Sequence, residues 1–180
     1  MTTGDIIEDD ESITDAKSLL ISIDAVFAEY TTWEERKIKL FKVLERVDLS
    51  TTEGNKYTFF DVEKPYTRNL IGTDHKNYTL LLLCWNPGRE SKIHNHPCDG
   101  CFIKTLAGCI KETRYEVKHS LDSIERKATR FYNEGQVSFM DDTIGLHKIG
   151  NPCNSTGAIS LHLYTPPFNA CKVDSHLKMS

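Results

Sequence analysis

The chain has 180 residues, of which 39% are hydrophobic and 27% are charged, and its formal net charge is −4. This length and composition fit a globular protein with one apolar core. The acidic balance, without a basic cluster, argues against nucleic acid as a partner. The longest apolar run, LLLLCW at Leu80–Trp85, is too short to cross a bilayer, so we expect no membrane partner.

The N-terminal stretch MTTGDIIEDDES is acidic and lacks the basic and apolar regions of a signal peptide. We therefore expect residues 1–12 to be a flexible leader, residues 13–180 to form a single domain, and the protein to be cytoplasmic. In that compartment the six cysteines are expected to stay reduced.

Two helices are predicted over about residues 13–48. The second begins with the capping box Thr32-x-x-Glu35. Apolar residues recur at helical spacing in both, namely Leu19, Leu20, Ile23, Val26, Phe27 and Tyr30 in the first and Leu40, Phe41, Leu44 and Val47 in the second.

From Asn77 onward the chain consists of short strand-like segments separated by turns such as NPG and NEG. The segments are NYTLLLLCW, SKIHNH, CFIKTLAGCIKETRYEV, KATRFYNEGQVSFM, GLHKIG and AISLHLYTPP. Successive strands without long helices between them predict an antiparallel sandwich or barrel, over about residues 57–180.

His94 and His96 would leave the same face of a strand and could converge on one metal ion, although two polar residues on a wet strand would give the same pattern. Cys98 and Cys101 form a CxxC motif, but a thioredoxin-like pair would open a helix and the following sequence is strand-like. A closed zinc site from these four residues would crowd all its ligands into eight residues, so we disfavour it.

The spacing of residues over a longer stretch indicates a fold more specifically than either short motif. The chain resembles the first cupin motif, G-x5-H-x-H-x4-E-x6-G, from Gly88 to Gly108, with Cys101 at the glutamate position. Gly135 followed by His147-x3-Asn151 resembles the second motif, with one extra residue before the histidine. The resemblance implies a mainly β fold, a cupin β-barrel or small jelly-roll-like sandwich, with an N-terminal helical region.

Three neutral imidazoles from His94, His96 and His147 would leave a divalent ion with its full charge and open coordination positions. The usual facial iron triad contains a carboxylate, which neutralises part of that charge. Such a site would therefore attract an anionic substrate, above all a thiolate.

Polar side chains alternate with leucines along AISLHLYTPP, so Ser160, His162 and Tyr164 share one face. This face could line an active site, or it could simply face water. Upstream, Tyr66 and Arg68 lie in YTRN, where the guanidinium suits a substrate carboxylate, although a lone arginine is usually a surface residue.

Together the blocks YTRN, LCW, CF-K-L-G--KET and SLHLY-PPF resemble the cysteine dioxygenase family, type I and animal-like, from about the first helix to near the end of the chain. The resemblance implies one Fe(II) held by His94, His96 and His147. It implies that L-cysteine binds the iron through its thiolate and amine, and that O2 adds both its atoms to the sulfur. Arg68 would bind the substrate carboxylate beside Tyr66.

The resemblance also implies a thioether between Cys101 and Tyr164 as a protein-derived cofactor. His162 would bond to Tyr164, with Ser160 in support, and the peptide before Pro166 would be cis. Two departures stand out. Gly100 replaces a histidine common in animal relatives and is expected to loosen the loop that carries Cys101, and the C-terminal strand and tail are expected to be truncated after HLKMS.

The expected function is oxidation of cysteine to cysteine sulfinate, in cysteine catabolism and taurine synthesis, by a monomer. One alternative is a dioxygenase for 3-mercaptopropionate or a related thiol, although Arg68 and Cys101 favour cysteine. The other is a non-catalytic metal-binding cupin, which would not require the polar set Arg68, Ser160, His162 and Tyr164.

Overall fold

The computed structural model of the protein describes residues 11–49, 52–96, 99–118, 123–167 and 178–179. Most of the expected leader, and Cys98, Phe168 and Cys171, lie outside these ranges. The helices are α1 (Ala16–Glu29), α2 (Trp33–Glu45) and the single-turn α3 (Thr52–Asn55). The strands are β1 (Tyr66–Thr73), β2 (Thr79–Trp85), β3 (Gly100–Ala107), β4 (Cys109–Lys118), β5 (Ser123–Asn133), β6 (Val137–Met140), β7 (Leu146–Gly150), β8 (Ala158–Thr165) and β9 (Lys178–Met179).

Local capping defines where the two long helices begin. The Asp15 carboxylate accepts a hydrogen bond from the backbone N–H of Ser18 at 2.9 Å, at the start of α1. The predicted N-cap of α2 is confirmed, since Thr32 Oγ1 accepts from the Glu35 N–H. The Glu35 carboxylate accepts from the Thr32 hydroxyl, whereas the usual capping box would bring it to the Thr32 backbone N–H. The apolar faces of both helices are buried, as their spacing predicts.

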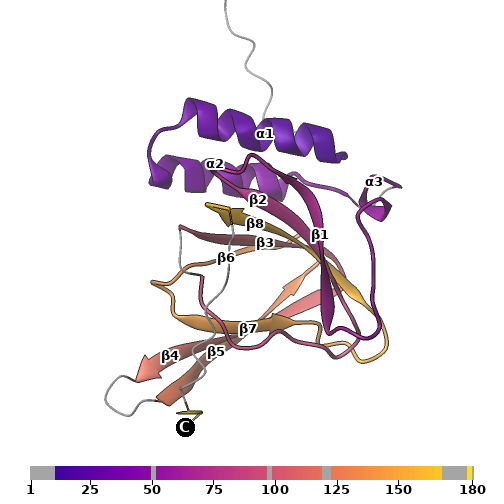
Figure 1. The fold of residues 1–180 in the computed structure, drawn as a ribbon, viewed down its shortest axis with the longest axis vertical. Helices are drawn as coiled ribbons and strands as arrows, with labels where there is room; N and C mark the ends of the chain where they lie inside the picture. The colour runs from indigo at the N-terminus through magenta and orange to yellow at the C-terminus, as the bar shows by residue number, and fades with distance from the viewer. Residues whose placement is uncertain (1–10, 50–51, 97–98, 119–122, 168–177, 180) are drawn as a thin grey trace, which may run out of the picture.

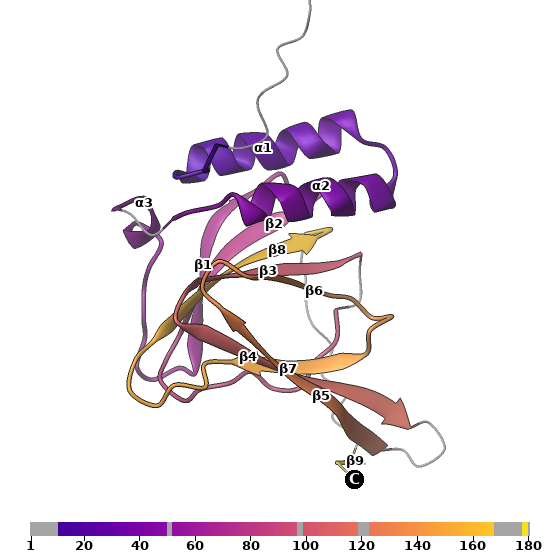
Figure 2. The ribbon, with the colours of Figure 1, turned by 180° about the vertical axis from the view of Figure 1, so that it is seen from behind.

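The strands form two sheets, one of five strands in the order β1-β2-β8-β3-β6 and one of four in the order β7-β4-β5-β9. Neighbouring strands are antiparallel except for β5 and β9. Helices α1 and α2 lie along the outer face of the five-stranded sheet, and the four-stranded sheet lies on the other side of it (Figures 1 and 2). The prediction of a mainly β fold with an N-terminal helical region is confirmed.

The five-stranded sheet is therefore buried on both faces, and it separates two apolar clusters. The cluster beneath the helices contains Leu80, Leu82 and Leu163 with the inner faces of α1 and α2. The cluster between the sheets contains Leu83, Trp85 and other apolar side chains from both sheets. Since alternate residues of a strand point to opposite faces, the run LLLLCW supplies both clusters at once.

Three local expectations differ from the structure. Strand β1 lies inside the range of about residues 57–180 expected for the barrel, but outside the strand-like segments, which begin at Asn77. It is an edge strand with a mainly polar sequence, and its pairing with β2 defines it. The segment SKIHNH is not a strand, because only isolated bridges at Glu90 and His94 join it to β7. Helix α2 ends at Glu45, and the separate single turn α3 follows the predicted end of the helical region at about residue 48.

None of the helices in the described part of the chain is long and apolar enough to span a membrane.

Candidate functional site

Three histidine rings meet inside the molecule, beside the sheet interface. His96 Nε2 lies 2.9 Å from His147 Nε2, which in turn lies 3.2 Å from His94 Nε2. No other group of three or more potential metal ligands occurs in the described ranges. Three ring nitrogens that all lie within 4.8 Å of one another could hold a cation through their lone pairs.

Backbone pairing brings the two histidine segments together. The N–H of His94 donates to the His147 carbonyl, and the N–H of His147 donates back to the His94 carbonyl, both at 2.9 Å. Three residues before His94, the Ser91 N–H donates to the Ile149 carbonyl at 2.7 Å. The convergence predicted for His94 and His96 is therefore achieved by a few bridges to β7, and not by a regular strand at SKIHNH.

The surroundings keep two of the imidazoles neutral. Burial, together with the neighbouring charge of His147, lowers the pKa of His94 to about 4 and that of His96 to about 2. A neutral ring has an unprotonated nitrogen, which is the form that binds a metal ion. At neutral pH these two rings are available as ligands without losing a proton.

The nitrogens that face away from the cluster have three different environments. His94 Nδ1 lies 2.8 Å from the Lys92 carbonyl, and His147 Nδ1 lies 2.9 Å from Glu112 Oε1. His96 Nδ1 is buried without a hydrogen-bond partner within the described ranges. Sequence reasoning missed Glu112, although it belongs to the KET block quoted for the family resemblance.

Glu112 is 1% exposed, and burial alone would raise the pKa of its carboxyl group. Hydrogen bonds from His147 and Arg114 outweigh that effect and lower this pKa below its usual value. The group is therefore an ionised carboxylate in the interior.

The cavity beside the three histidines includes most of the other predicted site residues, among them Tyr66, Arg68, His162 and Tyr164. Arg68 Nη2 donates to the Tyr66 hydroxyl at 3.0 Å, and its guanidinium lies 5.0 Å from the centre of that ring. The Tyr66 ring packs in turn on Trp85, with ring centroids 4.4 Å apart. Arg68 is therefore exposed to solvent, but its side chain lines the cavity and its guanidinium is bound to Tyr66.

The polar face of β8 is buried and does not face bulk water, and its residues His162 and Tyr164 line the cavity. Ser160, His162 and Tyr164 are at most 3% exposed. Ser160 Oγ accepts from Trp85 Nε1 and bonds to His162 Nε2, both at 2.8 Å. Sequence reasoning missed the role of Trp85 in these contacts, because a tryptophan in an apolar strand is equally typical of a residue that only packs in the core.

Tyr164 lies between two histidines. Its ring stacks on His96 with centroids 5.6 Å apart and on His162 with centroids 6.1 Å apart. His162 Nδ1 lies 3.8 Å from the sulfur of Cys101. The contact between His162 and Tyr164 that the structure records is this ring stack, and a hydrogen bond between them stays a prediction.

Cys101 and Tyr164 are directly opposite each other in the pairing of β3 with β8. Side chains at such positions are neighbours on one face of the sheet. Cys101 lies in strand β3 and not in a loop, and Gly100 before it is buried and is the first residue of that strand. Its φ of 136° suits glycine, and a Cβ there would overlap the ring of Phe139.

Other expectations can be compared with the structure. Cys101 begins no helix but lies in β3, which argues against a helix-opening redox pair. Four cysteines in the described ranges, Cys84, Cys101, Cys109 and Cys153, are free thiols. The peptide before Pro166 is cis, as predicted. Asn151 is buried and bonds to the loop backbone at the Thr156 carbonyl, away from the histidine rings.

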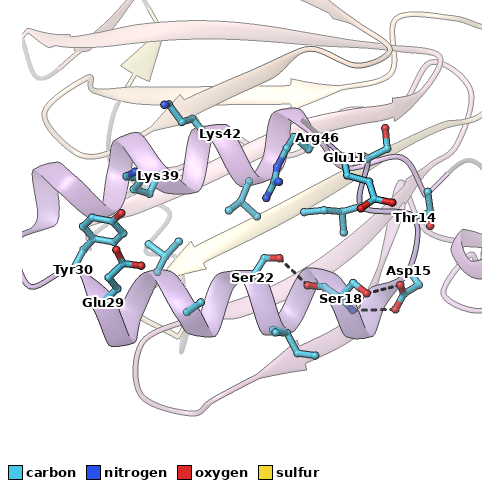
Figure 3. Close-up of a pocket in the computed structure, with 16 residues that line it drawn as sticks. Glu11, Thr14, Asp15, Ser18, Ser22, Glu29, Tyr30, Lys39, Lys42 and Arg46 are labelled. Carbon is cyan, nitrogen blue, oxygen red and sulfur yellow. Dashed lines mark hydrogen bonds between the residues drawn. The ribbon is translucent and has the colours of Figure 1, made fainter. Parts of the chain in front are cut away.

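A larger hollow, about 590 Å³, lies between α1 and α2 on the opposite side of the five-stranded sheet (Figure 3). The hydrogen bonds drawn there between Asp15 and Ser18 are explained by helix capping. Neither histidine nor cysteine lines this hollow. The smaller histidine cavity is therefore the candidate site, because it gathers the ligating groups.

Comparison with solved structures supports the cupin architecture. A protein of Klebsiella pneumoniae with a double-stranded β-helix domain aligns with a TM-score of 0.53. The alignment covers 69% of this chain and 91% of that one at 12% sequence identity, so it speaks for the fold alone.

Similarity in sequence identifies the family more specifically than similarity in fold. The chain is 40% identical over 131 residues to rat "Cysteine dioxygenase type 1" and 37% identical over 130 residues to the human protein of that name. Each match covers 72% of this chain but 64% of the relative, so the chain spans less than two thirds of their length. Residues 15–176 also match the profile described as "Cysteine dioxygenase type I". The chain, with its three-histidine site in a cupin fold, belongs to the cysteine dioxygenase type I family.

Proposed function

We propose that the protein is a thiol dioxygenase that converts L-cysteine and O2 to cysteine sulfinate at a mononuclear Fe(II) site. The thiol and both oxygen atoms of O2 are retained in the product, so no other reactant is required. The curated relatives are named for cysteine dioxygenation. The cytoplasmic location, the monomeric state and the role in cysteine catabolism and taurine synthesis belong to the same proposal and come from the resemblance.

The observation that carries the proposal is the pairing of three converging imidazoles with a nearby guanidinium in one cavity. His94, His96 and His147 would hold the ion from one side. A ferrous ion there would supply the redox chemistry that lets O2 react with a thiolate. Because Cys101 replaces the glutamate of the cupin motif, the ligand set has no carboxylate, and an anionic substrate would be favoured.

Arg68 would bind the substrate carboxylate through paired, charge-assisted hydrogen bonds, with Tyr66 holding its orientation. The rings of Tyr66 and Trp85 pack against each other, tilted by 32°, and form an apolar wall beside the guanidinium. A carboxylate fixed there would place the amine and thiol of the same small molecule toward the histidine rings. His162 and Ser160, linked to Trp85, would keep the adjoining wall on β8 rigid.

We also propose a thioether between Cys101 and Tyr164. The new S–C bond replaces the S–H of the cysteine and one ring C–H of the tyrosine, and O2 accepts the two electrons and two protons. The direct cross-strand pairing of the two residues supports this link. A peptide mass spectrum should reveal a Cys101–Tyr164 linked pair with two hydrogen atoms fewer than the separate peptides.

The test is oxygen consumption by the Fe(II)-loaded chain with cysteine and, separately, with 3-mercaptopropionate. We expect faster turnover of cysteine, with cysteine sulfinate as the product by mass spectrometry, and no turnover by the zinc-loaded chain. Much faster use of 3-mercaptopropionate would favour the related thiol dioxygenase. Iron binding without oxygen consumption would favour a non-catalytic metal-binding cupin.

A further inference from the structure

Glu112 is a buried carboxylate that contacts the histidine cluster at the Nδ1 atom of His147, the ring nitrogen that faces away from the other two histidines. Its Oε1 accepts from His147 Nδ1 at 2.9 Å, and its Oε2 accepts from Arg114 Nε at 2.9 Å and from the Tyr132 hydroxyl at 3.2 Å. A buried carboxylate is strongly disfavoured without such partners. Three donors from three neighbouring side chains therefore satisfy the hydrogen-bonding needs of this carboxylate.

The strand register explains how these groups meet. In the pairing of β4 with β7, Arg114 lies opposite His147 and Glu112 lies opposite Ile149, one step along the same face. Tyr132 reaches the carboxylate from β5, on the other side of β4. The contact is thus built into the central strand of a sheet, where the backbone has little freedom to move.

The three histidines differ in what supports them. His94 Nδ1 has a backbone carbonyl, and His96 Nδ1 has no hydrogen-bond partner within the described ranges. In those same ranges, Glu112 is the carboxylate that bonds to a ring of the cluster. Since the cupin glutamate position is occupied by Cys101, the negative charge of Glu112 reaches the ligand set through the ring of His147.

We propose that Glu112 is a positioning residue that keeps the proton of His147 on Nδ1 and leaves Nε2 bare toward the metal. Through that hydrogen bond it also supplies, indirectly, part of the negative charge that a ligating carboxylate would give. Arg114 holds the carboxylate in the required orientation through its charge-assisted bond of 2.9 Å. This inference rests on the metal site of the proposed function and names a residue on which that site depends.

The test uses Co(II) as the probe, with its affinity and visible absorption spectrum measured by titration of metal-free protein. Glu112→Ala should weaken Co(II) binding by about 10–100-fold, the usual effect of removing such a partner. Glu112→Gln keeps the size of the side chain, but its amide cannot accept hydrogen bonds from both His147 and Arg114. Glu112→Gln should therefore also weaken Co(II) binding and shift the absorption spectrum. If the alanine variant does not fold, the glutamine variant tests the inference.

Tyr132→Phe is the matched control, because it removes one hydrogen bond from the same carboxylate and leaves the contact with His147. It should bind Co(II) like the parent, with an unchanged spectrum. If folded Glu112→Gln has the affinity and spectrum of the parent, or if Tyr132→Phe has the same defect as it, the inference is overturned. Failure of the parent itself to bind Co(II) or Fe(II) would instead count against the proposed function.

Discussion

The two faces of the five-stranded sheet carry opposite kinds of side chain on the same strands. Toward the helices, Leu80, Leu82 and Leu163 are all 0% exposed and pack against α1 and α2. Toward the other sheet, His162 and Tyr164 are almost equally buried, yet they line the cavity with the three histidines. Burial alone therefore does not distinguish the face that stabilises the fold from the face that carries the site.

The two faces differ in the kind of contact that their side chains make. The helix-side residues need only complementary shape, so one apolar residue can replace another at modest cost. The cavity-side residues are joined by directed contacts, such as those from Trp85 through Ser160 to His162. Substitutions on the first face should change stability, and substitutions on the second should change metal or substrate binding.

The largest effect is expected for His147→Ala. Two imidazoles should not retain Fe(II) against dilution, so both bound iron and oxygen consumption should fall to background. Iron content after gel filtration and the rate with cysteine measure this. A variant that kept iron at the parental ratio would show that the three rings do not act as one ligand set.

Leu82→Ala should give the opposite result on the other face. Removing a fully buried side chain beneath the helices should lower the free energy of unfolding by about 2–5 kcal/mol. Urea denaturation measures the loss, while iron content and turnover per folded molecule should stay at the parental level. A large change in metal affinity would mean that the two faces are coupled.

Arg68→Ala should mainly raise the cysteine concentration needed for turnover. Loss of hydrogen bonds to a charged group is worth about 1.5–3 kcal/mol, and solvent exposure of Arg68 places the expected fall in kcat/KM near tenfold, or about 1.4 kcal/mol. Steady-state kinetics with cysteine tests this, with Arg68→Lys as the charge-conserving control. Kinetics identical to the parent would remove Arg68 from the substrate site.

Tyr164→Phe is the subtlest change on the cavity face. It should abolish the proposed thioether, since the phenol activates the ring for attack by sulfur, and it should slow turnover. Iron binding should remain, because the Tyr164 ring still stacks between His96 and His162. Peptide mapping and iron content are measured together, and a linked peptide in this variant would contradict the proposed bond.

Sequence patterns predicted the parts of the fold that depend on local chemistry. The N-cap at Thr32 and the alternation at Ser160, His162 and Tyr164 need only neighbouring residues to be recognised. Edge strand β1 and the non-strand segment around His94 were missed, because pairing with distant residues defines them. Glu112 was missed for the same reason, since it bonds to a histidine 35 residues away along the chain.

The sequence by itself determined the mainly β fold, the three histidines and the polar face of β8, because residue type and spacing specify which groups can share a face or a metal. The tertiary structure alone decided which nitrogens meet, that Gly100 is fixed in β3 beside Phe139, and that a buried carboxylate supports His147. Those contacts join strands far apart in the chain, and their distances follow from sheet pairing and packing that no short stretch of sequence encodes.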